Sequence, residues 1–133
     1  MIIFHSISLL ILIYLYQKLY FSHLISKNKF KWLGRIDNVI NSGGVKLFPE
    51  QIEKKLDHLI EGRFFIASEE DAKLGNKVIL ILEGNPIDLD KKKFEVLSKY
   101  ERPKSIYFIS KFSETKTGKI NRNETLKKVR TAR

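Results

Sequence analysis

The spacing of apolar residues changes several times along residues 30–133, and each change predicts a new element. Phe30–Ile36 is rich in strand-forming residues and predicts an extended segment. Ser42-Gly43-Gly44 predicts a tight turn, and Val45–Phe48 a second short strand after it. Pro49 then stands where a helix can begin. Four apolar residues recur behind it at helical spacing before Gly62 ends the pattern: Ile52, Leu56, Leu59 and Ile60.

Three apolar runs further along predict core strands, and two amphipathic segments predict helices. The runs are Arg63–Ser68, Lys77–Leu82 and Ser105–Ser110. Residues 90–100 predict a helix that turns Phe94 and Leu97 inward, and residues 121–129 predict a short final helix after a polar loop at 113–119. The pattern predicts an α+β domain with an N-terminal β-hairpin and a three-stranded sheet packed by helices.

The first 29 residues differ in character and form an apolar leader ahead of the domain at residues 30–133. Met1–Gln17 carries no charged side chain, and as a helix it would span roughly 25 Å, short of the roughly 30 Å hydrocarbon core of a bilayer. Lysines follow it, so insertion would leave the rest of the chain in the cytoplasm. Three interpretations stay open: membrane association through residues 1–22, a buried strand, or a leader foreign to the domain. The expected location is cytoplasmic in each case.

Composition excludes several kinds of site. The chain has no cysteine, so disulfides, thiolate metal sites and cysteine nucleophiles are excluded, and its three histidines lie far apart. The formal charge of +10 lies in the last third, because residues 1–90 carry 11 basic and 11 acidic side chains whereas residues 91–133 carry 14 and 4. This basic segment predicts either a solvated tail or a surface for anionic lipid or nucleic acid.

One basic residue, Lys119, stands at a special position. The segment Thr115-Lys116-Thr117-Gly118-Lys119 does not fit the GxxxxGK[ST] pattern of a phosphate-binding P-loop, which needs Gly at Ser113 and Ser or Thr at Ile120. A lysine carried by a glycine-containing loop just before a helix still suits charge that develops on a phosphate. The competing interpretation is a solvated lysine of the basic tail.

A second set of residues gives this loop its context. Gly34-Arg35-Ile36-Asp37, Ser42-Gly43-Gly44, Pro49–Glu53, Leu74-Gly75 and Arg102-Pro103 precede Thr115–Arg122 in this order. Together they resemble the C-terminal lid domain of the AMP-forming acyl-CoA synthetase (adenylate-forming) superfamily, over residues 30 to about 128. The residues of the first motifs, within Phe30–Glu53, are most similar to those of o-succinylbenzoate–CoA ligases of menaquinone biosynthesis.

The resemblance implies a two-step reaction and a role for several residues. A carboxylic acid attacks the α-phosphate of ATP, and the thiol of CoA then displaces AMP from the acyl-adenylate. Lys119 matches the catalytic lysine of the first step, and Thr117 and Gly118 match its supporting loop. Arg35 matches a nucleotide-binding residue and Asp37 the hinge of the lid. The turn Ser42, Gly43 and Gly44 matches the loop that acts in the thioester step.

The same resemblance implies the partners. ATP and CoA are expected as substrates, with Mg²⁺ bound to ATP in the full enzyme, and none of them is expected on this domain alone. The large N-terminal adenylation domain, which holds the ATP and carboxylic acid pockets, has no counterpart here, so the isolated chain is expected to be inactive. The alternative is a membrane-associated basic module, for which nucleic acid is the less favoured ligand because Phe94, Tyr107 and Phe108 fall at core positions.

The motifs also depart from the family at two places. Asn38 stands where a second acid is common, and the proline often found ahead of the lysine loop is replaced around Ser113. The first change predicts little effect, because Asp37 keeps the hinge position. The second predicts a looser lysine loop.

Overall fold

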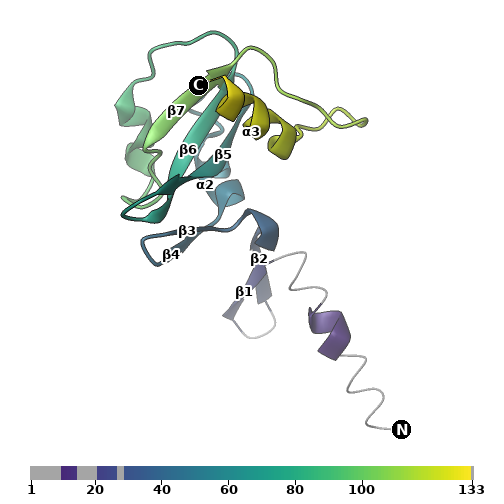
Figure 1. The fold of residues 1–133 in the computed structure, drawn as a ribbon. Helices are drawn as coiled ribbons and strands as arrows, with labels where there is room; N and C mark the ends of the chain where they lie inside the picture. The colour runs from purple at the N-terminus through teal and green to yellow at the C-terminus, as the bar shows by residue number, and fades with distance from the viewer. Residues whose placement is uncertain (1–9, 15–20, 27–28, 133) are drawn as a thin grey trace, which may run out of the picture.

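A β-hairpin and a short helix stand apart from a larger sheet in the structure, a computed structural model that describes residues 10–14, 21–26 and 29–132 (Figure 1). The hairpin pairs β1 (Phe21–Ser26) with β2 (Lys29–Gly34) in antiparallel fashion. Residues 10–14 are helical and their side chains are exposed. No helix in the described part of the chain has the length and apolar character needed to cross a membrane. Most of the proposed leader, residues 1–9, 15–20 and 27–28, lies outside the described residues.

The larger sheet has five strands, and the second hairpin of the chain forms one end of it. Its strands are β3 (Ile40–Ser42), β4 (Val45–Leu47), β5 (Phe64–Asp71), β6 (Gly75–Glu83) and β7 (Ser105–Ile109). The order is β4-β3-β6-β5, and β7 also pairs with β6. β5 runs antiparallel along β6, so β3 and β7 share the opposite edge of β6, with Ser42 opposite Gly75 and Ser105 opposite Ile79. The hairpin therefore extends the three predicted core strands into one sheet.

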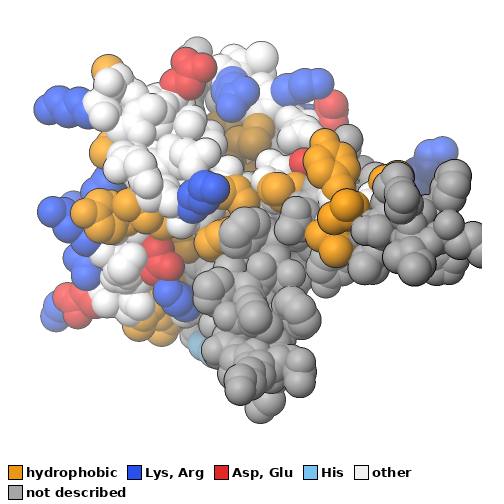
Figure 2. Space-filling view, turned by 90° about the horizontal axis from the view of Figure 1, so that it is seen from below, with side chains coloured by type: hydrophobic (Ala, Val, Ile, Leu, Met, Phe, Trp, Pro, Cys, Tyr) orange, Lys and Arg blue, Asp and Glu red, His pale blue; other side chains and the backbone are white. Residues whose placement is uncertain are grey.

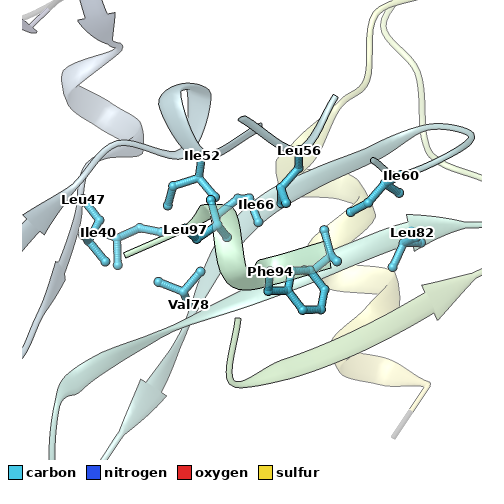
Figure 3. Packing of buried hydrophobic residues seen from close by; sticks show 11 residues of the cluster. Ile40, Leu47, Ile52, Leu56, Ile60, Ile66, Val78, Leu82, Phe94 and Leu97 are labelled. Carbon is cyan, nitrogen blue, oxygen red and sulfur yellow. The ribbon is translucent and has the colours of Figure 1, made fainter. Parts of the chain in front are cut away.

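Successive residues of β5 and β6 point to opposite sides, so the sheet has an apolar cluster on each face. Helices cover both faces. One face packs against α2 (Pro49–Leu56) and the 3₁₀ helix η2 (Lys91–Val96), as the close view in Figure 3 shows. Its buried cluster is Ile40, Leu47, Ile52, Leu56, Ile60, Ile66, Val78, Leu80, Leu82, Phe94 and Leu97. α2 begins at Pro49, the position predicted from the sequence, and buries the predicted Ile52 and Leu56.

The other face packs against α3 (Arg122–Thr131), which lies in front of the strands in Figure 1. Its buried residues are Phe65, Ala67, Ile79, Ile81, Phe112 and Val129. The Asn121 side chain accepts a hydrogen bond from the backbone N–H of Glu124, 3.2 Å away, and so caps the start of α3. The start of α3 fixes the end of the preceding loop, which carries Lys119.

Two elements differ from the sequence prediction in length or type. The segment 90–100 is not an α-helix: η2 ends at Val96, and a loop follows. Asp90 caps its first turn by accepting from the N–H of Lys92, and Phe94 and Leu97 are buried as predicted. α2 ends at Leu56, well before Gly62, yet Ile60 is buried; the turn after the helix keeps a hydrogen bond from the N–H of Ile60 to the carbonyl of Leu56 at 3.1 Å. The apolar spacing correctly predicts which side chains are buried, but not the exact helix ends.

Candidate functional site

Lys119 lies in a tight loop that leaves its side chain exposed. The loop has two strand-like stems: the first leads up to Glu114, and the second starts at Ile120. The two stems meet through the antiparallel bridge between Glu114 and Ile120. Within it the N–H of Thr115 donates to the carbonyl of Lys119 at 2.8 Å, and the N–H of Gly118 donates to the carbonyl of Thr115 at 3.0 Å. Gly118 has a φ of 82°, in the left-handed region that favours glycine. The loop therefore has a defined backbone and presents the ammonium group toward solvent.

The hydroxyls of Thr115 and Thr117 form hydrogen bonds within the same loop. The Oγ1 atoms of Thr115 and Thr117 lie 3.1 Å apart, and Thr115 Oγ1 also accepts from the N–H of Lys119 at 3.2 Å. These hydrogen bonds form over a short stretch of chain and need no distant partner. The threonines and the glycine of the motif thus fix the direction in which the Lys119 side chain leaves the loop.

The first stem of the loop is tied to the sheet by a cluster around Arg63. Its Nη1 donates to Glu114 Oε1 at 2.7 Å, and its Nε and Nη2 donate to the two oxygens of Glu83 at 2.9 and 2.5 Å. Glu83 Oε2 also accepts from the N–H of Phe112 at 2.7 Å. The guanidinium lies 5.6 Å from the centre of the Phe112 ring. Arg63 therefore links the end of β6 to residues just before the loop.

Two groups of this cluster, Arg63 and Glu83, have shifted pKa values. Hydrogen bonds from Arg63, and next from the N–H of Phe112, lower the pKa of Glu83 below its ordinary value of 4.5. The hydrogen bond to Glu83, and next that to Glu114, raises the pKa of Arg63. A carboxyl whose pKa is lower in the folded state stabilises the fold above the unfolded pKa, and this contribution is lost as pH falls through the folded value.

We expect Glu83→Gln to flatten the acid side of the stability profile. The wild-type chain should lose free energy of unfolding as pH falls below about 4.5, and the variant should lose less, because it carries no carboxylate to protonate at this position. Urea unfolding of the full chain from neutral to acidic pH measures the difference. Glu95→Gln, which removes an exposed carboxylate from η2, should keep the wild-type profile. Parallel profiles for wild type and Glu83→Gln would contradict the role given to Glu83.

The second stem is tied to α2 by the ion pair of Arg122 with Glu53. The two guanidinium nitrogens lie 2.7 and 2.9 Å from the two carboxylate oxygens, a two-pronged geometry. Glu53 Oε1 also accepts from the N–H of Ile66 in β5 at 2.9 Å. Arg122 lies over the ring of Phe65, 5.4 Å from its centre. Both stems of the Lys119 loop are therefore bonded to the sheet or to α2.

The expected hinge lies between β2 and β3. The short 3₁₀ helix η1 (Ile36–Asn38) holds Asp37, which is exposed, and Arg35, also exposed, precedes it. Glu50 of α2 holds this segment, because its Oε1 accepts from Asn38 Nδ2 at 2.7 Å and from the N–H of Arg35 at 3.4 Å. Its Oε2 is buried without a hydrogen-bond partner in the described part of the chain. A Cβ atom at Gly34, where φ is 146°, would lie 2.5 Å from this oxygen.

The contact with Glu50 gives Asn38 a role of its own. An acid at this position would place two carboxylates at hydrogen-bond distance and remove the donor that Glu50 now uses. From the sequence alone the change of acid to asparagine predicts little effect, because Asp37 keeps the hinge position. The structure adds that the Asn38 amide supplies the hydrogen-bond donor that the Glu50 carboxylate uses.

Asn38→Asp is expected to lower the free energy of unfolding by about 1–3 kcal/mol at neutral pH, because a half-buried carboxylate loses its donor and gains a like charge. At mildly acidic pH one of the two carboxyls takes up a proton and can donate to the other, so the deficit should shrink. Asn38→Ala removes the donor without adding charge, and its deficit should change less with pH. Urea unfolding of the three proteins at both pH values tests this. An Asn38→Asp deficit that stays constant with pH would rule out the like-charge explanation.

One groove brings the hinge residues next to the lysine loop. It has a volume of about 550 Å³, and its walls come from Arg35, Asp37, Asn38 and Glu50 on one side and from Thr115, Ile120, Arg122 and Asn123 on the other. Residues 80 positions apart in the sequence are thus neighbours. The structure places Arg35, Asp37 and the base of the Lys119 loop in one region, although each was singled out from a separate motif.

The turn Ser42, Gly43 and Gly44 does not belong to this region. It joins β3 to β4, and in Figure 1 it lies at the end of the domain away from the Lys119 loop. Ser42 is buried, while Gly43 and Gly44 are exposed with φ values of 58° and 81°. The N–H of Gly43 donates to the carbonyl of Leu74 at 2.9 Å, which anchors the turn to the loop before β6. The candidate residues therefore form two separate groups on one small domain.

The supporting residues Glu53, Arg63, Glu83 and Arg122 were given no role from the sequence alone. Glu53 and Arg122 lie inside motifs that were noticed, but their pairing spans 69 positions and no sequence signal indicates it. Arg63 and Glu83 look like ordinary polar ends of two strands. No three His, Asp or Glu side chains converge on a candidate metal site anywhere in the described ranges.

Comparison with known proteins adds sequence and structural relatives, although no family model matches the chain. A 2-succinylbenzoate–CoA ligase of Lactococcus lactis subsp. lactis (strain IL1403) is 36% identical over 95 residues, covering 69% of this chain and 21% of the relative. An acyl-CoA synthetase (AMP-forming)/AMP-acid ligase II-like protein from Dyadobacter fermentans DSM 18053 is 39% identical, with a TM-score of 0.66 over 84% of this chain and 34% of that one. The chain is a homologue of the AMP-forming acyl-CoA synthetases.

The chain corresponds to only a small part of these acyl-CoA synthetases. The chain spans about a fifth of the curated relative's length. The fold matches as well: o-succinylbenzoate CoA synthetase from Bacillus subtilis, solved with its acyl-adenylate intermediate, gives a TM-score of 0.67 at 23% identity over 77% of this chain. The α+β class and the lid-domain resemblance predicted from the motifs are confirmed.

Proposed function

We propose that the chain acts as the mobile lid of an AMP-forming acid–CoA ligase and that Lys119 is its catalytic residue. One observation carries the proposal: Lys119 is exposed at the tip of a loop whose two stems are both tied down by ion pairs. A solvated tail lysine needs no such support. A lysine that must reach a reacting phosphate in a partner domain does, because the position of a catalytic charge decides its effect.

In the first step the substrate carboxylate attacks the α-phosphorus of ATP. A new P–O bond forms, the bond to the β-phosphate oxygen breaks, and pyrophosphate leaves. Negative charge accumulates on the α-phosphate and the attacking oxygen, and the Lys119 ammonium offsets it as a fixed positive charge. Mg²⁺ would arrive on the phosphates of ATP and assist there by polarising them. We place Arg35 near the nucleotide, since it shares the groove at the base of the Lys119 loop.

In the second step the CoA thiolate attacks the acyl carbonyl, the bond to the phosphate oxygen breaks, and AMP leaves. The turn at Ser42, Gly43 and Gly44 lies at the other end of the domain, so one rotation could withdraw Lys119 and bring this turn forward. Gly43 and Gly44 have no side chains and let backbone approach a narrow ligand arm. Asp37 is suited to the hinge, because it lies in the short segment η1 between two hairpins.

The relatives support a proposal for the substrate and for the partner. We infer that the acid is o-succinylbenzoate, since 2-succinylbenzoate–CoA ligases are among the relatives by sequence and by structure. The partner is the large domain that holds the ATP and acid pockets, with residues 30–133 as its lid. This chain on its own is then inactive, because Lys119 has no nucleotide to act on.

The alternative, a basic module for anionic surfaces, finds little support in the arrangement of charges. On the face shown in Figure 2, Lys and Arg side chains are spread singly and mixed with Asp and Glu. Lys127 pairs with Glu124, and Arg122 pairs with Glu53. Glu53 lies outside the last third, so its pair with Arg122 offsets part of the +10 of that segment, and basic side chains are not gathered into one patch on the face shown.

The test supplies the full chain in excess to the separately produced large domain of the Lactococcus lactis ligase. We expect acyl-CoA formation from o-succinylbenzoate, ATP and CoA to rise with added chain until it saturates, and neither component to be active alone. A saturating rise with another acid would keep the lid function and correct the substrate. Absence of any rise with a folded chain would reject the lid function.

A further inference from the structure

We propose that Arg63 and Glu53 are positioning residues that hold the Lys119 loop from its two stems, and that the speed of the first step depends on them. The inference rests on the proposed function, because it concerns where the catalytic ammonium is placed. It goes beyond that function by assigning a catalytic consequence to two ion-pair clusters at the stems of the loop.

The first stem is held in place by Arg63. Arg63 uses three of its nitrogens, two on Glu83 and one on Glu114, so its guanidinium plane is fixed relative to β6. Glu114 is the residue that bridges to Ile120, next to Lys119. A change in the position of Glu114 is therefore passed through this bridge to Ile120, the residue beside Lys119. The side chains of Arg63 and Glu114 are 37% and 40% exposed, so this contact adds little to stability and serves mainly to fix position.

The second stem is held in place by the ion pair of Arg122 with Glu53. Arg122 is the first residue of α3 and follows Lys119 closely. Its two-pronged pair with Glu53 fixes the end of the second stem. Glu53 is in turn held by the N–H of Ile66 on β5. Arginine suits this contact because its planar fork fixes direction as well as distance, which a lysine ammonium does not.

The buried hydroxyl of Thr125 connects the two stems. Thr125, which is fully buried, accepts from the N–H of Ser113 at 3.1 Å and donates to the carbonyl of Asn121 at 2.8 Å. The N–H of Asn121 also donates to the carbonyl of Ser113 at 2.7 Å. The stem at Ser113 was predicted to be looser for lack of a proline, and these contacts hold it instead.

Both clusters border the same groove beneath the loop. Its walls include Glu53, Arg63, Phe64 and Ile120, so the two ion pairs flank the base on which the loop stands. A loop held at one stem only could pivot about that stem, whereas a loop held at both cannot. A displacement of about 1 Å at a catalytic group can cost on the order of 100-fold in rate. The pair of clusters is therefore expected to affect kcat of the first step rather than substrate binding.

The experiment measures each chemical step separately in the saturated mixture of full chain and large domain. Pyrophosphate release reports the first step, and thioester formation from prepared acyl-adenylate reports the second. We expect Glu114→Gln and Glu53→Gln to slow the first step by about 10-fold, with the KM for ATP and the second step unchanged. Arg63→Lys should behave like Glu114→Gln, because it keeps the charge but loses the fork. Glu124→Gln, which breaks the exposed pair with Lys127 on α3, is the matched control and should leave both steps unchanged.

Each outcome decides between two claims. If Lys119→Ala slows the first step and the stem variants do not, the positioning role is wrong and the lid function stands. If Lys119→Ala has no effect, Lys119 is not the catalytic residue and the positioning role falls with it, whereas the lid function is tested separately by the saturating rise on mixing. If the stem variants slow both steps equally together with a lower melting temperature, the clusters are structural only and the inference is overturned. Glu114→Gln is the most informative variant, because its side chain is the most exposed of those involved and its loss should disturb the fold least.

Discussion

Replacing Lys119 by alanine is expected to slow acyl-adenylate formation by about 10²–10³-fold, a loss of roughly 3–4 kcal/mol of transition-state stabilisation. The loss is large because the ammonium acts on charge that exists mainly in the transition state, and no other lysine lies at the same position of the loop. Binding of ATP should change little, and thioester formation from prepared acyl-adenylate should be unaffected. Pyrophosphate release by the saturated mixture of chain and large domain measures the first step.

Lys116 supplies the control for this result. It belongs to the same exposed loop and carries the same charge, but Thr117 and Gly118 separate it from Lys119. Lys116→Ala should therefore keep most of the wild-type rate. Equal losses in the two variants would mean that the loop contributes only general positive charge. In that case Lys119 would not be the catalytic residue.

Phe65→Ala is expected to destabilise the full chain by about 3–5 kcal/mol. Phe65 is fully buried on β5, its ring meets that of Phe112 edge-on with centres 5.3 Å apart, and Arg122 covers it. The substitution leaves a cavity at the centre of the cluster under α3, and it removes the surface on which the second stem of the lysine loop rests. Because single domains are stable by only about 5–15 kcal/mol, this is a large part of the total.

Chemical unfolding followed by circular dichroism measures this loss. Tyr100→Ala removes an aromatic ring that is 52% exposed and should change the free energy of unfolding by less than about 0.5 kcal/mol. A similarly small change for Phe65→Ala would contradict the packing described for the α3 face. A large loss would also explain any fall in ligase activity of this variant without a role in the chemistry.

The core of the domain was predictable because it depends on local patterns. The apolar run at Lys77–Leu82 becomes β6, buried on both faces, and Pro49 begins α2 as predicted. The helix expected at 90–100 is instead a single short 3₁₀ segment, because two inward residues, Phe94 and Leu97, can be buried without a regular α-helix. The sequence also did not predict that β3 joins β6, since that contact consists of one residue pair.

The candidate site was predictable only where it is continuous in sequence. The Lys119 loop is one such stretch, and the structure gives it the tight turn that Gly118 indicated. The supports of the loop come from α2, β6, α3 and the residue just before β5, and they are held by ion pairs between residues 20 to 69 positions apart. Charged residues at strand ends are common, so nothing marks Arg63 or Glu83 before the chain is folded. Asn38 had a signal, its departure from the family pattern, but its meaning required Glu50 beside it.

Residue-specific labelling of lysines tests the central claim most directly, because it detects where Lys119 lies without relying on activity. The saturated mixture of full chain and large domain is treated with an amine-reactive reagent, with and without a non-reactive analogue of the acyl-adenylate, and labelling of each lysine is followed by mass spectrometry. We predict that the analogue slows labelling of Lys119 and leaves the labelling of Lys116 unchanged. Equal labelling of both lysines in the presence and absence of the analogue would contradict it, because Lys119 would then remain in solvent when the adenylating site is filled.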